Sequence, residues 1–211
     1  MPTSTAVQPA VPSAVPVGEP ITFDDYIARD DDRKADLIDG HLIDDMPTYE
    51  HEKLFYFLLF VLGGFVSKRN LGEVLGSRTP VRIDGRNGVE PDILFVRKDR
   101  IGVIERLYLS GAPDVAVEIV SPTSTRRDYV RKRAAYEQMG VAEYWLIDPQ
   151  ENTTLFLRLT PGGTYRDVTP APGEQFESYA VAGFALDPAL LFADELPNEF
   201  DLLTEMLNEL S

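Results

Sequence analysis

The clearest indication of the fold lies in residues 114–148, DVAVEIVSPTSTRRDYVRKRAAYEQMGVAEYWLID. This stretch starts as an apolar, β-branched run (114–120), continues as a polar segment with helical spacing (126–139), and ends in a second apolar run (143–148). Gly140 stands where the helix would end, a position that favours glycine. The order strand, helix, strand predicts a β-α-β unit with a right-handed crossover.

Turn and helix signals on both sides of this unit predict the rest of the fold. Asp39-Gly40 between two alternating apolar runs indicates a hairpin over KADLIDGHLIDDM, residues 34–46. The mixture predicts an α/β fold with a mixed β-sheet flanked by helices and additional antiparallel strands. The other expected elements are a short helix capped by Thr22, a helix over 49–69, strands over 73–83 and 89–97, antiparallel strands over 152–181 and a helix over 197–209.

Composition excludes some classes of site and location. The 211 residues include no cysteine, so disulfides and thiolate metal sites are excluded. The longest apolar run, residues 54–66, is shorter than the ~20 residues that span a bilayer. Residues 1–28 contain no Lys or Arg, so a signal peptide is not expected and we expect a cytoplasmic protein. Residues 1–19 are expected to be a disordered lead-in and residues 193–211 an acidic helix or tail.

The charge of the chain is strongly acidic but uneven. A net charge of −15 argues against a general nucleic-acid coat, because phosphate binding relies on Lys and Arg. The segment RRDYVRKR, residues 126–133, is locally basic. Two interpretations stay open for Arg126, Arg127, Arg131 and Arg133: contacts with nucleic-acid backbone phosphates, or a solvated helix face.

Two carboxylates interrupt apolar strands. Side chains alternate along a strand, so Glu118 shares a face with Ala116 and Val120, and Asp92 likewise faces apolar neighbours of its own strand. A buried charge needs a partner or a cation. Two acids that converge from neighbouring strands suit Mg²⁺ or Mn²⁺. The alternative for Glu118 is a solvated strand end or an ion pair with Arg. The alternative for Asp92 is that it only begins a strand, because Pro-Asp is a common dipeptide at that position.

Lys132 is predicted to share one helical face with Asp128 and Tyr136, because residues four apart are neighbours on a helix. In one interpretation Lys132 reaches back over the two carboxylates and orients or activates an attacking water. In the other, Asp128 and Lys132 form a surface ion pair worth a few tenths of a kcal/mol.

Several stretches, taken in this order, resemble the Uma2 family of restriction-endonuclease-like proteins in the PD-(D/E)XK nuclease superfamily. They are DLIDGHLIDDMPTYEH (36–51), GVEPDILFV (88–96), APDVAVEIVSPTSTRRD (112–128) and KRAAYEQMGVAEYWLIDP (132–149). The resemblance covers roughly residues 20–190. It implies a restriction-endonuclease-like core in a nuclease-like domain over residues 20–192.

The resemblance also implies roles for single residues. Asp92 and Glu118 would bind Mg²⁺ or Mn²⁺, with the backbone carbonyl of Ile119 as a third ligand. The superfamily usually has a lysine two residues after the acid, but Val120 stands there. The resemblance moves this role to Lys132, which would position the attacking water.

Asp36, His51 and Tyr136 are the candidates for accessory roles. The family's hairpin often carries two glutamates, and Asp36 and His41 replace them here. Asp36 keeps a carboxylate on a shorter side chain, whereas His41 does not keep the charge. His51 has a second interpretation, as a structural hydrogen-bonding residue at the start of a helix.

These observations lead to a main hypothesis and two alternatives. The main one is a Mg²⁺-dependent endonuclease acting on nucleic acid, with DNA favoured as substrate and a homodimer expected from the long apolar helix. The net charge and the substituted hairpin acids favour a catalytically inactive binding protein that keeps the nuclease fold. Hydrolysis by paired carboxylates without metal is disfavoured by the nearby lysine.

Overall fold

The computed structural model describes residues 19–30, 34–44 and 46–209. Its helices are α1 (Phe23–Ile27), α2 (Tyr49–Arg69), α3 (Arg133–Met139) and α4 (Glu199–Asn208), with 3₁₀ helices at Lys98–Val103 and Pro188–Phe192 and a π-helix at Arg127–Lys132. Its strands are β1 (Ala35–Ile38), β2 (His41–Asp44), β3 (Gly72–Gly76), β4 (Val81–Arg82), β5 (Gly88–Val89), β6 (Ile93–Arg97), β7 (Val115–Ile119), β8 (Glu143–Asp148), β9 (Thr153–Leu159), β10 (Tyr165–Asp167), β11 (Phe176–Glu177) and β12 (Ala185–Leu186).

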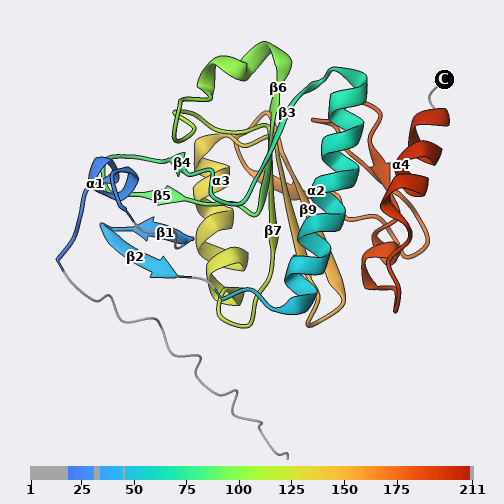
Figure 1. Cartoon of the computed structure of the whole chain (residues 1–211), viewed down its shortest axis with the longest axis horizontal. Coiled ribbons are helices and arrows are strands. Elements are labelled where there is room, and N and C mark those ends of the chain that lie inside the picture. The colour runs from blue at the N-terminus through green and yellow to red at the C-terminus, as the bar shows by residue number, and fades with distance from the viewer. Residues whose placement is uncertain (1–18, 31–33, 45, 210–211) are drawn as a thin grey trace, which may run out of the picture.

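The central element is a six-stranded mixed sheet with the order β10-β9-β8-β7-β6-β3. Strands β7 and β8 are parallel and are connected through the π-helix and α3, while the other neighbours in the sheet are antiparallel. Figure 1 shows α2 on one side of this sheet and α3 on the other. The predicted α/β fold, its mixed sheet with flanking helices, and the β-α-β unit are therefore confirmed.

Alternation along β7 separates two hydrophobic cores. Val115, Val117 and Ile119 pack with α2 and α4 in one core. Ala116 and Val120 belong to a second core on the opposite face, together with residues of α3 and β8. This arrangement confirms the predicted faces of the strand, and it places Glu118 on the face that the π-helix and α3 cover.

The predicted hairpin forms at β1 and β2, which pair in an antiparallel register with Ile38 opposite His41. Asp39 and Gly40 both have positive φ, 51° and 82°. A turn with two such residues matches the twist of the strands it joins, and Asp-Gly is favoured there. The hairpin belongs to a second sheet with the order β2-β1-β5-β4.

The two strands predicted over 73–83 and 89–97 are each divided between the two sheets. The first becomes β3, in the six-stranded sheet, and β4, in the four-stranded sheet. Arg78, at φ 74°, and Pro80 lie between them. The second becomes β5 and β6, with Pro91 between them. Proline has no N–H for a strand ladder, so pairing is interrupted where it stands.

The predicted helix over 126–139 is a π-helix followed by α3, which ends at Gly140 with φ 83°. The C-terminal helix is confirmed as α4, which packs against α2 and buries Met206. The predicted lead-in lies, apart from Glu19, outside the described residues, as do residues 210 and 211 of the acidic tail.

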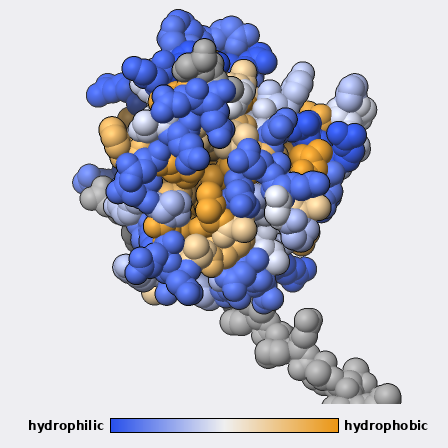
Figure 2. Space-filling view, turned by 90° about the vertical axis from the view of Figure 1, so that its right-hand side faces the viewer, coloured by the Kyte–Doolittle hydropathy of each residue, from blue (hydrophilic) through white to orange (hydrophobic). Residues whose placement is uncertain are grey.

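The molecular surface on the side of α4 carries hydrophobic side chains between polar ones (Figure 2). The predicted homodimer stays a prediction, as do the domain boundaries. Among the described residues, no helix combines the length and the hydrophobicity that a membrane span requires.

Candidate active site

Asp92 and Glu118 face one another across β6 and β7. The strands are antiparallel, with Ile93 opposite Val117 and Leu94 opposite Ala116. Continuing this register by one residue brings Asp92 opposite Glu118, and side chains in such a pair lie on the same face. Both carboxylates are buried. The predicted convergence of the two acids is therefore present in the fold.

The Asp92 carboxylate is held at both of its oxygens. Its Oδ2 accepts a hydrogen bond from the Ile119 backbone N–H at 2.7 Å. Its Oδ1 forms an ion pair with Lys34 and lies 3.2 Å from Nε2 of His51. Burial alone would raise the pKa of Asp92, but the charge of Lys34 and the contact with His51 outweigh it and lower the pKa. Asp92 is thus ionised at neutral pH.

The Glu118 carboxylate has different partners. Its Oε2 lies 2.9 Å from Nζ of Lys132, and its Oε1 accepts a hydrogen bond from the Tyr136 hydroxyl at 2.7 Å. Neither sequence-based alternative, a solvated strand end or an ion pair with Arg, describes this carboxylate. Burial and the nearby charges of Asp128 and Asp92 raise the pKa of Glu118, although Lys132 opposes them.

Lys132 lies among three carboxylates. Its Nζ is 2.9 Å from Glu118, 3.3 Å from Oδ2 of Asp36 and 3.7 Å from Oδ1 of Asp128. Burial opposes its charge, but the carboxylates outweigh burial and raise the pKa of Lys132. The pair Asp128–Lys132 is therefore part of a buried network, and not the surface pair of the alternative interpretation. The ammonium is a permanent cation at neutral pH.

The π-helix places Asp128 and Lys132 on this inner side. Its first turn is fixed by Ser124, whose hydroxyl bonds to Oδ2 of Asp128, and by Tyr144, whose hydroxyl donates to the backbone carbonyl of Asp128 at 3.0 Å. Burial is the main reason that the pKa of Asp128 is raised. Short π-helical segments are rare in proteins, and those that do occur often lie at functional sites.

The four arginines of the basic segment do not share one environment. Arg126, Arg131 and Arg133 are exposed. Arg127 is buried, with its Nε 3.0 Å from Oδ2 of Asp36. For Arg127 the structure thus supports an internal ion pair instead of an exposed phosphate contact.

His51 reaches Asp92 from the first turn of α2. The helix is capped by Thr48, whose hydroxyl accepts a hydrogen bond from the His51 backbone N–H at 3.2 Å. Burial disfavours the charged imidazole, but the close contact with Asp92 and the charge of that carboxylate outweigh burial and raise the pKa of His51. His51 therefore joins the site through Asp92, in addition to its place at the helix start.

Two further residues of this region, Lys34 and Glu90, were not predicted from the sequence. Lys34 contacts Asp92 from the segment before β1, and no periodicity in the sequence signals that contact. Glu90 accepts a hydrogen bond from the Tyr26 hydroxyl at 2.5 Å, and its backbone N–H donates to Oδ1 of Asp36 at 2.9 Å. Its position two residues before Asp92 was a signal for a buried polar residue.

The donor atoms fit a divalent cation of the Mg²⁺ type. Asp92, Glu118 and the Ile119 carbonyl supply oxygen atoms, which such ions prefer. The ammonium of Lys34 at Oδ1 of Asp92 shows that a cation is accommodated at this oxygen. Within the described ranges, no cluster of three or more His, Cys, Asp or Glu side chains has the geometry of a metal site. A site here would therefore need the backbone carbonyl and water as further ligands.

Comparisons with known proteins bear on the fold and on the family of the chain. A crystal structure described as a putative nuclease belonging to DUF820, from Anabaena variabilis ATCC 29413, is similar to this structure with a TM-score of 0.67 and 23% sequence identity. The similarity covers 82% of this chain and 98% of that chain, and it bears on the fold. No curated protein matches the chain.

The family comparison extends over most of the domain. The model of the Uma2 family, described as "Putative restriction endonuclease", matches residues 22–189. This range contains the hairpin, Asp92 directly before β6, Glu118 on β7, and the lysine of the π-helix. The chain belongs to the Uma2 family.

Proposed function

We propose that this protein is a divalent-metal-dependent endonuclease that hydrolyses phosphodiester bonds of nucleic acid. The observation that carries the proposal is the buried contact of Lys132 with Glu118, which lies opposite Asp92 on the neighbouring strand. Family membership supports a nuclease-like function. The metal, its ligands and the role of each residue are parts of the proposal.

Asp92, Glu118 and the Ile119 carbonyl would hold Mg²⁺ or Mn²⁺. When bound, such an ion lowers the pKa of a coordinated water and stabilises negative charge at phosphate oxygens. Asp92 is suited to ligation because it is ionised and its second oxygen is fixed by the Ile119 N–H.

Lys132 would orient the attacking water as a hydrogen-bond donor. Its pKa is raised, so it keeps its proton and does not serve as a general base. Asp36 and Asp128 also contact the ammonium of Lys132. The Tyr136 hydroxyl donates a hydrogen bond to Oε1 of Glu118, the oxygen that Lys132 does not contact. These contacts keep the lysine and the glutamate in one orientation without a ligand.

Arg126 precedes the π-helix, Arg131 lies within it and Arg133 begins α3, and all three side chains are exposed. They would contact backbone phosphates of the substrate. DNA is the favoured substrate.

A binding protein without catalytic activity is the second candidate. One observation favours it: every carboxylate of the cluster already has a cationic neighbour. Asp92 contacts Lys34, and Lys132 contacts Glu118, Asp36 and Asp128. Metal binding would require Lys34 to leave Oδ1 of Asp92, and an inactive relative would keep this contact.

Two substitutions test the proposal. Glu118→Gln and Lys132→Ala should reduce Mg²⁺- or Mn²⁺-dependent DNA cleavage by about 100-fold or more, because the first removes a proposed metal ligand and the second the group that would orient the attacking water. Glu118→Gln should also weaken Mn²⁺ binding in calorimetry. Glu205→Gln and Lys68→Ala are matched controls, since both residues are exposed on other helices. Neither should change cleavage.

The second candidate makes the opposite prediction. If the wild-type protein binds DNA, does not bind Mn²⁺ and cleaves no nucleic acid, the proposal of an endonuclease is wrong. Cleavage that survives both substitutions at the wild-type rate would overturn the assignment of the site.

A further inference from the structure

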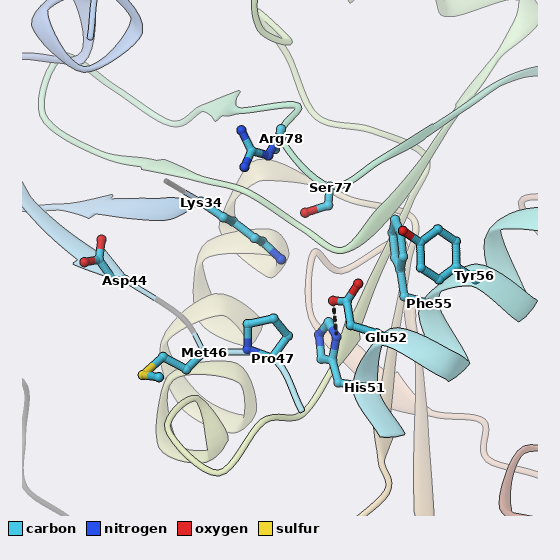
Figure 3. Close-up of a pocket in the computed structure, with 10 residues that line it drawn as sticks. All are labelled: Lys34, Asp44, Met46, Pro47, His51, Glu52, Phe55, Tyr56, Ser77 and Arg78. Carbon is cyan, nitrogen blue, oxygen red and sulfur yellow. Dashed lines mark ion pairs between the residues drawn. The ribbon is translucent and has the colours of Figure 1, made fainter. Parts of the chain in front are cut away.

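A pocket of about 610 Å³ lies between the start of α2 and the connection from β3 to β4, with Lys34 and His51 in its lining (Figure 3). This volume is in the range of about 300–1,000 Å³ that is usual for small-ligand pockets. Two of the residues that line it, Lys34 and His51, are also the residues that contact Oδ1 of Asp92. The inner wall of the pocket is therefore one side of the candidate active site.

The outer part of the pocket is aromatic and apolar. Phe55 and Tyr56, from the second turn of α2, stand side by side with their ring centroids 5.3 Å apart. Tyr56 is 66% exposed, and Met46, also at the pocket, is 72% exposed. Large side chains of this kind expose apolar surface to water at a cost, and exposed aromatic rings are the usual platforms for stacking of nucleic-acid bases.

Arg78, at the rim of the pocket, has a cationic side chain and an unusual backbone conformation. It lies in the connection between β3 and β4, and Figure 3 shows its guanidinium on the side of the pocket above Lys34. Its φ is 74°, a conformation that costs energy for a residue with a side chain. Such residues persist only where their surroundings determine them, and they cluster at binding sites.

The charges in the pocket are divided. Lys34 and Arg78 provide positive charge on one side. Glu52 lies at the other, with its Oε1 3.3 Å from Nδ1 of His51. Asp44 is a second acid of the lining, on the far side of Lys34 from Glu52. A phosphate group would therefore be repelled from both acids and attracted toward Arg78 and Lys34 between them, which leaves the aromatic wall for an uncharged part of the ligand.

We propose that this pocket binds one unpaired nucleotide of the substrate, with its base stacked on Tyr56 and its phosphate toward Lys34 and Arg78. The substrate class is then single-stranded or locally unpaired nucleic acid, because a base can stack on a protein ring only after it leaves its own stack. The inference rests on the proposed function and adds the form of nucleic acid that the site accepts.

Binding to fluorescent oligonucleotides tests the proposal. Fluorescence anisotropy is measured in Ca²⁺ with a single strand and with the matching duplex. The wild type should bind the single strand more tightly. Tyr56→Ala should weaken that binding by about 5- to 100-fold, because stacking on one aromatic ring is lost. Tyr56→Phe keeps the ring and should bind as the wild type does.

Two further variants separate binding from folding. Phe200→Ala removes an aromatic residue of α4 that is equally exposed, at 65%, and should leave binding unchanged. Arg78→Gly removes the guanidinium and relieves the positive φ, so it should weaken binding, and the midpoint of thermal unfolding measured beside it shows whether the variant is folded at the assay temperature.

The possible results distinguish this inference from the proposed function. If the wild type cleaves DNA in a manner that depends on Glu118, but prefers the duplex or is unaffected by Tyr56→Ala, the pocket proposal alone is wrong. If the wild type neither binds nor cleaves any nucleic acid, the proposed function fails, and the pocket proposal fails with it.

Discussion

Glu118 is a buried carboxylate whose surroundings do not favour its charge. Lys132 and the Tyr136 hydroxyl contact its two oxygens, yet burial and the neighbouring carboxylates Asp128 and Asp92 raise its pKa. A group of this kind costs folding free energy in its ionised form. Residues retained at such a cost are candidates for function.

Replacement of Glu118 by glutamine should therefore stabilise the metal-free protein at alkaline pH. The ordinary pKa of the carboxyl is near 4.5 and the folded value is higher, so the folded protein holds this proton over a wider pH range than the unfolded chain. Wild-type stability falls as pH rises through the folded value, and glutamine removes that loss.

Thermal unfolding in EDTA at several pH values measures the effect. The gain from Glu118→Gln should be largest above the raised pKa and should shrink as pH falls below it, where the wild-type glutamate is protonated. A variant that is less stable than the wild type at alkaline pH would show that the ion pair with Lys132 outweighs the cost of burial.

The first turn of α2 contains both the N-cap of this helix and a residue of the candidate site. Thr48 caps the helix through the backbone N–H of His51, and the side chain of the same residue reaches Asp92. Loss of the cap would loosen the first turn and with it the contact between the imidazole and the carboxylate.

Thr48→Ala should lower the free energy of unfolding by about 1 kcal/mol, as is usual for a lost N-cap. It should also reduce nuclease activity several-fold, because His51 is displaced, and Thr48→Ser should restore both. Denaturant unfolding and cleavage assays measure the two effects.

Asn198 provides the matched control for this prediction. It caps α4 by accepting hydrogen bonds from Phe200 and Asp201. Asn198→Ala should lower stability by a similar amount and leave the activity per folded molecule unchanged. Equal activities of the two alanine variants would contradict a role for the α2 cap in the site.

Across the whole molecule, buried ion pairs connect the two sheets. Asp36 belongs to β1 of the four-stranded sheet, and its partners Arg127 and Lys132 lie on the π-helix that covers the six-stranded sheet. Lys34, just before β1, makes a second link to Asp92. The candidate site is thus at the junction between the sheets (Figure 1).

The net charge of −15 should make the stability of the protein depend on salt. Exposed charges of one sign repel one another in the compact state, and salt screens them over about 10 Å at 0.1 M, whereas the buried pairs are screened much less. The midpoint of thermal unfolding in EDTA should therefore rise between about 10 mM and about 150 mM NaCl.

The same measurement in tetramethylammonium chloride is the control. An equal rise in both salts indicates general screening, and a rise in NaCl alone indicates specific binding of sodium. A fall in the midpoint would mean that attractive surface pairs outweigh the net repulsion.

Local patterns in the sequence determined much of this fold. Alternation of side chains placed Asp92 and Glu118 on one face of adjacent strands, and spacing of four placed Lys132 near Tyr136. Asp39-Gly40 formed its turn and Gly140 ended its helix. These features depend on backbone conformation over a few residues, which the residue types themselves favour.

Contacts between distant segments were decided only by the tertiary structure. Nothing near Arg127 in the sequence distinguishes it from Arg126 or Arg131. In the structure, however, Arg127 is buried against Asp36, which belongs to the four-stranded sheet. Lys34 contacts Asp92 for the same reason, and the predicted strands over 73–83 and 89–97 divide where the two sheets meet. Partners of a buried charge depend on how sheets and helices pack, and local sequence preferences carry no information about that packing.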